Sequence, residues 1–144
     1  MDRSPTPARR PPARIVARIV AAFGVAAGVV LLVIGIRFLV WPEAATRAFG
    51  LGGRPPSTAL DAVIGLRDLW LALLAIAFAL LREWRALALW LLLGAGVCLG
   101  DAAIVAHHGG PWTALLFHGT SGLLCGLAGW RCWLLGRRTW GRAE

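Results

Sequence analysis

The sequence has few charged residues and no lysine. Only 15% of its 144 residues are charged, whereas 58% are hydrophobic; ordinary soluble domains have about 25% charged and about 45–50% apolar residues. A soluble fold of this length has too little interior to bury so much apolar surface, and so apolar a chain does not stay disordered in water. The composition therefore excludes an ordinary soluble domain and predicts a protein embedded in a lipid bilayer.

Cysteine is scarce too, and the short motifs of familiar enzyme sites are missing. The three cysteines form no CxxC pair, which argues against a disulfide framework and against a zinc module. The chain has no GxGxxG after a strand, no P-loop, no GxSxG and no HExxH. We therefore expect no cofactor. Because no helical HxxxH or ExxH pair occurs either, we also expect no metal site.

The charges that are present are mostly positive and lie outside the apolar segments. Fifteen arginines against seven acidic residues give a net charge of +8, a balance that can indicate a nucleic-acid partner. Here the arginines gather at the two ends of the chain and in short connections, so they form no continuous basic face. We therefore expect no nucleic-acid partner, and we expect the lipid bilayer to be the main partner.

Four long apolar segments occupy most of the chain, at residues 15–41, 60–81, 86–106 and 113–135. About 20 apolar residues are enough for a helix to cross the hydrocarbon core of a bilayer. The pattern thus predicts a transmembrane domain over residues 14–138. Residues 1–13, rich in proline and arginine, are expected to form a disordered basic tail, and residues 139–144 a second tail.

Short connections between these segments place consecutive helices antiparallel. Pro42 is expected to end the first helix, because proline disfavours helix at the residue before it, and to begin a loop that runs to Pro56. The predicted fold is therefore all-α: an integral membrane four-helix bundle with up-down topology. Arginines mark the cytoplasmic side of membrane proteins, and only Arg47 and Arg54 fall on the opposite side. We therefore predict a multi-pass protein of the cell inner (plasma) membrane with both termini on the cytoplasmic side.

The polar side chains within and at the ends of the apolar segments gather in the outer half of the predicted bundle, and the inner half carries almost none. These side chains are Arg37, Asp61, Arg67, Asp68, Asp101, His107, His108 and His118. Ionisable residues are costly inside a bilayer and usually face the interior of a bundle. Asp61 is interpreted as an acid at the interface that starts a helix. Four segments that contribute polar groups at a similar depth indicate one shared pocket.

Helical phase supports an inward direction for these groups. Residues three or four positions apart share a helix face, which places Asp101 beside small residues and His118 beside Ser121. A histidine opposite an aspartate exchanges protons near neutral pH. We therefore assign catalytic roles to Asp68, Asp101 and His118. Substrate-binding roles are assigned to Arg37, Arg67, His108 and Ser121.

Each assignment has a structural alternative. Arg67 with Asp68 or Asp101 is equally compatible with an ion pair that only fixes helix register. Arg37 is compatible with snorkelling to the outer interface, and His108 with a solvated helix end. Adjacent residues point about 100° apart on a helix. On this basis Arg67 can reach a neighbour other than Asp68, so that the two need not neutralise each other.

Glycines recur four residues apart in three of the segments, as Gly24 and Gly28, Gly96 and Gly100, and Gly122 and Gly126. Such small-xxx-small pairs let helix backbones approach closely in a membrane. Packing within one chain is the favoured interpretation, and a homodimer through the glycine stripes is the alternative.

Four stretches of the chain carry a resemblance to a known family. They are GLRDLWLALL at 65–74, RALALWLLLGAGVCLGDAAIV at 85–105, HHGG at 107–110 and FHGTSG at 117–122. In this order they resemble a small four-helix membrane family known as a domain of unknown function, family four-two-six-seven. The architecture is loosely similar to that of DoxX-like membrane proteins. The resemblance covers residues 20–135 and is most specific at Arg67-Asp68, Gly100-Asp101 and His118. It supports the architecture and the choice of site residues, and it supplies no reaction.

Three functions fit these features. The first is binding of a lipophilic small molecule, or acid/base action on it as in an isomerase or cyclase, which needs no cofactor. The alternatives are a small proton-coupled transporter that works as a dimer and a non-enzymatic accessory membrane subunit. Against the transporter, the polar groups stop halfway through the bundle, whereas alternating access needs a site that is reachable from both sides.

Overall fold

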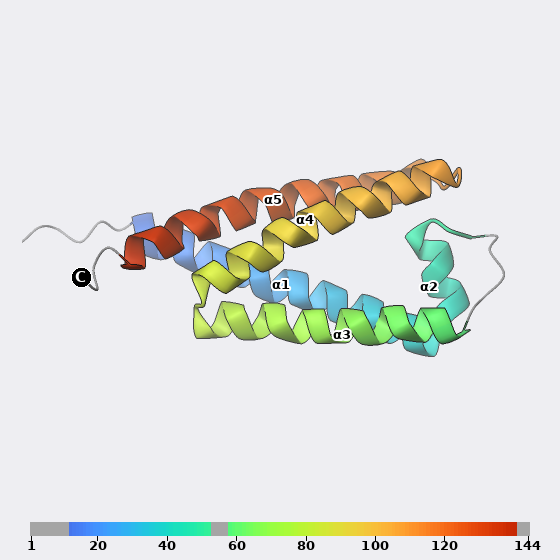
Figure 1. Ribbon diagram of the computed structural model, residues 1–144, viewed down its shortest axis with the longest axis horizontal. Coiled ribbons are helices and arrows are strands. Elements are labelled where there is room, and N and C mark those ends of the chain that lie inside the picture. Colours follow the sequence, from blue (N-terminus) through green and yellow to red (C-terminus); the bar gives the residue numbers. More distant parts are fainter. Residues whose placement is uncertain (1–11, 53–57, 141–144) are drawn as a thin grey trace, which may run out of the picture.

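The computed structural model describes residues 12–52 and 58–140, and within these residues the elements are five helices (Figure 1). The helices are α1 (Pro12–Val40), α2 (Pro42–Phe49), α3 (Thr58–Leu81), α4 (Trp84–His107) and α5 (Trp112–Trp140). The predicted all-α class is thus confirmed. Each of the four long helices, α1, α3, α4 and α5, contains most or all of one predicted apolar segment.

The long helices extend beyond the predicted segments. α1 begins at Pro12 and α5 runs to Trp140, so both take in residues that were expected in the tails. The rest of the two predicted tails lies outside the described residues, and so does the end of the predicted loop at 53–57.

The predicted loop after α1 is wrong at its start, where the chain forms helix α2. Proline is tolerated in the first turn of a helix because its missing N–H has no helical partner there, so Pro42 ends α1 and also begins α2. Glu43 lies in the first turn of α2, and Gly50 ends it with a φ of 105°. An acid at the start and a left-handed glycine at the end are both typical of a helix.

The four long helices pack as two pairs, α1 with α3 and α4 with α5 (Figure 1). Glycines allow the close approach within each pair. A Cβ atom added to Gly65 of α3 would lie 2.8 Å from the backbone oxygen of Gly35 in α1. A Cβ atom added to Gly35 would likewise lie 2.8 Å from the backbone oxygen of Gly65. A Cβ atom added to Gly129 of α5 would lie 2.9 Å from Cγ of Leu92 in α4. At these crossings only glycine leaves room for the neighbouring helix.

The two pairs meet at the end of the molecule where α3 connects to α4, which we call the inner end. The buried cluster there consists of Val20, Ala79, Leu87, Ala88, Leu91 and Cys132. Toward the opposite, outer end the pairs diverge, and α2 lies between them (Figure 1). A Cβ atom added to Gly50, at the end of α2, would lie 2.8 Å from Cβ of Ala114 and 2.9 Å from Cγ1 of Val105. α2 therefore joins the two pairs at the outer end.

Three of the described helices are long and apolar enough to cross a membrane, at Ile15–Val40, Ala59–Leu81 and Trp84–His107. Large apolar side chains such as Ile19, Val63 and Leu93 are exposed on them. Exposed apolar surface of this extent is normal in lipid and not in water. The helices therefore indicate a membrane protein. α5 has 29 residues and is not among the three.

The recurring glycines fall into two groups. Added Cβ atoms on Gly24, Gly28 and Gly122 would each lie within 3.3 Å of a neighbouring helix, and one on Gly126 would lie 3.8 Å from Cβ of Ala95. Packing within the chain therefore accounts for these four. Gly96 and Gly100 on α4 have no atom within 4 Å of an added Cβ. A homodimer through the glycine stripes stays a prediction.

Candidate functional site

His118 lies buried on α5, packed against helix α2. Its Nε2 is 3.2 Å from the carbonyl oxygen of Phe49, and since a carbonyl only accepts, the Nε2–H of the histidine donates this hydrogen bond. The Phe49 ring packs on the imidazole at a centroid distance of 4.5 Å and meets Phe38 of α1 edge-on at 6.3 Å. α2 thus orients the ring of His118, and Nδ1, which has no hydrogen bond to the described residues, is the acceptor nitrogen of the neutral ring.

Asp61 lies in the first turn of α3, as expected for an acid that starts a helix, and it is buried. Its Oδ1 accepts a hydrogen bond from Thr46 Oγ1 at 3.4 Å. Its Oδ2 is buried and has no hydrogen-bond partner in the described part of the chain. Thr46 and Phe49 were missed as site residues because their segment was expected to be a loop. The helix signals around them, Pro42 and Gly50, would have revealed them.

We expect Thr46→Val to destabilise the outer end. Valine keeps the shape of threonine and removes the one side-chain hydrogen bond that Asp61 accepts among the described residues. A buried polar group left unsatisfied costs about 1–3 kcal/mol. Thermal unfolding in detergent measures this loss. Thr120→Val is the matched control, because the exposed Thr120 hydroxyl bonds only to carbonyls of its own helix. Equal midpoints for Thr46→Val and the unmodified protein would contradict the prediction.

Arg67 and Asp68 form an ion pair on α3, which corrects the expectation that these neighbours need not neutralise each other. Nη2 and Nε of Arg67 donate to Asp68 Oδ1 at 3.0 and 3.1 Å. Adjacent residues do diverge by about 100° around a helix, but the long aliphatic stem of arginine lets the guanidinium fold back. The Arg67 side chain remains 57% exposed, against 7% for Asp68. The pair therefore neutralises a buried carboxylate and keeps part of the guanidinium accessible.

Asp101 on α4 is half-buried and forms no hydrogen bond or ion pair with the described residues. Its carboxylate is nevertheless near enough to His118 of α5 and Arg67 of α3 for their charges to interact, and it also interacts with Asp68. Asp101 thus lies within electrostatic range of Arg67, Asp68 and His118, which belong to two other helices. We call these four residues the polar layer.

The other predicted binding residues lie outside this set. Arg37 is exposed in the last turn of α1. Ser121 is half-buried, three residues after His118 on α5. His108 is exposed at the end of α4, where its Nδ1–H donates to the carbonyl oxygen of Ile104 at 2.9 Å. By helical spacing Ser121 shares a face with His118, and His108, seven residues after Asp101, lies close to the face of Asp101, whereas α1 with Arg37 carries no member of the polar layer.

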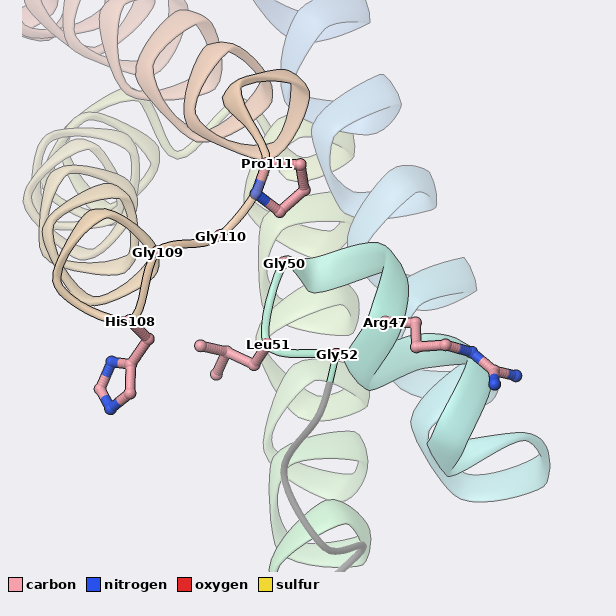
Figure 2. Close-up of a pocket in the computed structure, with 8 residues that line it drawn as sticks. All are labelled: Arg47, Gly50, Leu51, Gly52, His108, Gly109, Gly110 and Pro111. Atoms are coloured by element: carbon pink, nitrogen blue, oxygen red, sulfur yellow. The ribbon is translucent and has the colours of Figure 1, made fainter.

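His108 instead lines a pocket of about 470 Å³ at the outer end (Figure 2). The lining residues are Arg47, Gly50, Leu51, Gly52, His108, Gly109, Gly110 and Pro111. Figure 2 shows the Leu51 side chain extending toward His108, whereas the Arg47 guanidinium points away. Glycine backbone forms much of the wall, so this pocket offers few polar side chains. No member of the polar layer lines it.

The polar layer is suited to hydrogen bonding and proton transfer. It offers one guanidinium as a donor, two carboxylates as acceptors and one imidazole that can do both. Across residues 12–52 and 58–140, no three His, Cys, Asp or Glu side chains are grouped as metal ligands would be.

Comparison with known proteins places the chain in a family. Neither the curated proteins nor the solved structures give a match. The model of a family described as a domain of unknown function (DUF4267) matches residues 28–134, a range that holds α3, α4 and every residue of the polar layer. The resemblance seen in the sequence is therefore confirmed, whereas the looser similarity to DoxX-like proteins stays a prediction. Since the match covers most of its length, the chain belongs to the DUF4267 family.

Proposed function

We propose that the protein binds a lipophilic small molecule at the polar layer and acts on it by acid/base chemistry, as an isomerase or cyclase does. The observation that carries this proposal is Asp101, a half-buried carboxylate in an apolar helix without a hydrogen-bond partner in the described chain. Such a group is costly in a bilayer. Strained or uncompensated ionisable groups tend to be kept where function needs them.

The members of the polar layer divide into two roles. Asp101 and His118 are the acid/base pair, because the imidazole Nδ1 is left unbonded when Nε2–H donates to Phe49. Arg67 holds the polar head of the ligand. Asp68 is better suited to positioning Arg67 than to proton transfer, since the guanidinium already occupies its Oδ1.

The proposed site requires a four-span topology. α5 packs along α4 (Figure 1), so α5 lies at the same depth as a helix that is long and apolar enough to cross a membrane. We therefore include α5 as a fourth span in an up-down four-helix bundle. The arginine distribution then favours cytoplasmic termini and the plasma membrane. The polar layer would lie in the outer half of this bundle.

The test measures the lipophilic material that copurifies with the protein. The unmodified protein and Asp101→Asn are purified in mild detergent, extracted with organic solvent and compared by mass spectrometry. We expect one class of molecule to be enriched over bulk membrane lipid and to fall about tenfold or more in Asp101→Asn. A hydrogen bond to a charged group contributes about 1.5–3 kcal/mol, and every 1.4 kcal/mol is a factor of about ten.

Glu43→Gln is the control, because Glu43 is an exposed acid on α2. Undiminished enrichment in Asp101→Asn contradicts the proposal. Misfolding of both Asp101→Asn and His118→Gln would instead favour the accessory subunit, in which the polar layer serves packing alone.

A further inference from the structure

We propose that the inner end of the protein carries a binding surface for an anionic phospholipid, formed by Arg82, Arg85 and Arg137. We call these three residues the arginine patch. The patch lies at the inner end, whereas His118 of the polar layer packs on α2 at the outer end. The proposal therefore does not depend on the proposed function. It rests on the contacts, the charge and the depth of the three arginines.

Contacts between α4 and α5 bring the arginine patch together at the inner end (Figure 1). A Cβ atom added to Gly136 of α5 would lie 2.8 Å from Cγ of Arg85 in the first turn of α4. Arg137 directly follows Gly136, and Arg82 lies three residues before Arg85, in the turn that joins α3 to α4. The guanidinium carbon of Arg85 lies 5.7 Å from the ring centroid of Trp133 on α5, a distance at which the ring attracts the cation. Two helices and one turn thus contribute guanidinium groups to one region of the surface.

The arginine patch carries an excess of positive charge. All three arginines are exposed. Among the described residues of this region Glu83 is the only acid, and it forms no ion pair with Arg82 or Arg137. Charges of one sign that lie close together repel each other, so an anion at this surface would lower the energy of the arrangement. Guanidinium groups bind phosphate oxygens through two parallel hydrogen bonds, which makes phosphate the anion that fits.

The depth of the arginine patch matches the headgroups of a bilayer. The parts of α3 and α4 that are apolar enough to cross a membrane end at Leu81 and begin at Trp84. Arg82 therefore lies between the two spans, and Arg85 lies within the first turn of the second. Tryptophan is enriched at the boundary between lipid and water, and both Trp84 and Trp133 are half-buried there. The phosphates of the membrane lipids lie at this same boundary, so they are the anions nearest to the patch.

Exposed apolar side chains lie where the acyl chains of such a lipid would run. Leu89 of α4, four residues after Arg85, is 52% exposed, and Trp130 of α5, seven residues before Arg137, is 57% exposed. Residues four or seven positions apart share a helix face, so these side chains follow the arginines toward the middle of the bilayer. One lipid can thus place its phosphate at the arginine patch and its chains against α4 and α5.

The net charge of the headgroup decides which lipid the arginine patch prefers. Phosphatidylcholine has a phosphate, but its trimethylammonium group brings a positive charge to the same surface and leaves the headgroup neutral. Phosphatidylglycerol has the same phosphate and an uncharged glycerol in place of choline, so it keeps a single negative charge. Basic residues at a membrane surface attract anionic lipids for this reason. The arginine patch should therefore select phosphatidylglycerol over phosphatidylcholine.

The experiment compares these two lipids, with identical acyl chains, on the full-length protein. The protein is kept in mild detergent and titrated with either lipid, and native mass spectrometry measures the lipid-bound fraction. We expect phosphatidylglycerol to bind at least about tenfold more tightly. Arg82→Gln and Arg137→Gln should each weaken its binding about fivefold and leave phosphatidylcholine binding unchanged. This factor corresponds to about 1 kcal/mol for one basic residue near an anionic headgroup.

Arg47→Gln is the matched control, because it removes the same charge from an exposed arginine of α2 at the outer end. Equal affinities of the unmodified protein for the two lipids overturn the proposal, and this comparison needs no variant to fold. A loss in Arg47→Gln as large as in Arg137→Gln also overturns it, since the net charge of the protein and not the arginine patch would then attract the lipid. Neither result bears on the ligand of the polar layer.

Discussion

Gly65→Val is expected to force α1 and α3 apart and to cost about 3 kcal/mol or more of stability. A Cβ atom at this position would lie 2.8 Å from the backbone oxygen of Gly35 and 2.8 Å from Cγ of Leu39. Extra atoms in a well-packed site typically cost about 1–3 kcal/mol. The upper end of this energy range applies to Gly65→Val, because the Gly35 oxygen belongs to the backbone of α1 and cannot rotate away as a side chain does.

The midpoint of thermal unfolding in detergent measures this effect. Gly96→Val is the matched control: it places the same β-branched side chain inside a helix, at a site with no atom within 4 Å of an added Cβ. The two variants share any change in helix propensity, so the difference between them reports the crossing of α1 and α3. Similar midpoints for both variants would refute the idea that this crossing holds the pair together.

Gly50→Ala is expected to detach α2 from the α4–α5 pair. Gly50 has a φ of 105°, and a Cβ there would lie 2.8 Å from Cβ of Ala114 and 2.9 Å from Cγ1 of Val105. The left-handed conformation alone costs a non-glycine residue about 1–2 kcal/mol, and the collision adds to it. Once α2 moves, Phe49 withdraws from His118. We expect the equilibrium constant for detachment of α2 to rise about tenfold, since about 1.4 kcal/mol corresponds to a factor of ten.

Alkylation of the native cysteines by a maleimide reports this opening. Cys98 is half-buried on α4, three residues before Asp101, and should react about tenfold faster, whereas Cys132, buried at the inner end, serves as the reference. Gly109→Ala is the control, because Gly109 also has a positive φ, of 67°, but no atom within 4 Å of an added Cβ. If Gly109→Ala accelerates the Cys98 reaction as much as Gly50→Ala does, backbone strain and not the docking of α2 explains the result.

The four long helices could be predicted from the sequence because each one is a continuous apolar segment of membrane-spanning length. The inward direction of Asp68 and His118 could also be predicted, since both are buried as their helical phase requires. These features depend on residues close together in the chain. The match to a family of unknown function supports the family assignment and supplies no chemistry.

The features that sequence reasoning missed depend on contacts between distant residues or on side-chain length. α2 was missed because Pro42 was interpreted only as the end of α1, although proline also begins helices. The burial of Asp61 follows from α2 and could not be anticipated without it. The Arg67–Asp68 ion pair was missed because the prediction used only the directions in which adjacent side chains leave the helix. The arginine side chain is long enough to fold back toward Asp68.

The arrangement of the two helix pairs has a mechanical consequence. The buried cluster around Leu87 and Cys132 holds the two pairs together at the inner end. From Leu87, α4 continues to His107, a length of about 30 Å at about 1.5 Å per residue. A rotation of one pair by about 5° about this cluster shifts the outer end of α4 by about 3 Å, while the cluster itself scarcely moves. In the proposed four-span topology, a tilt of one pair would therefore widen the outer end, and the contacts of Gly50 with Val105 and Ala114 would oppose this movement.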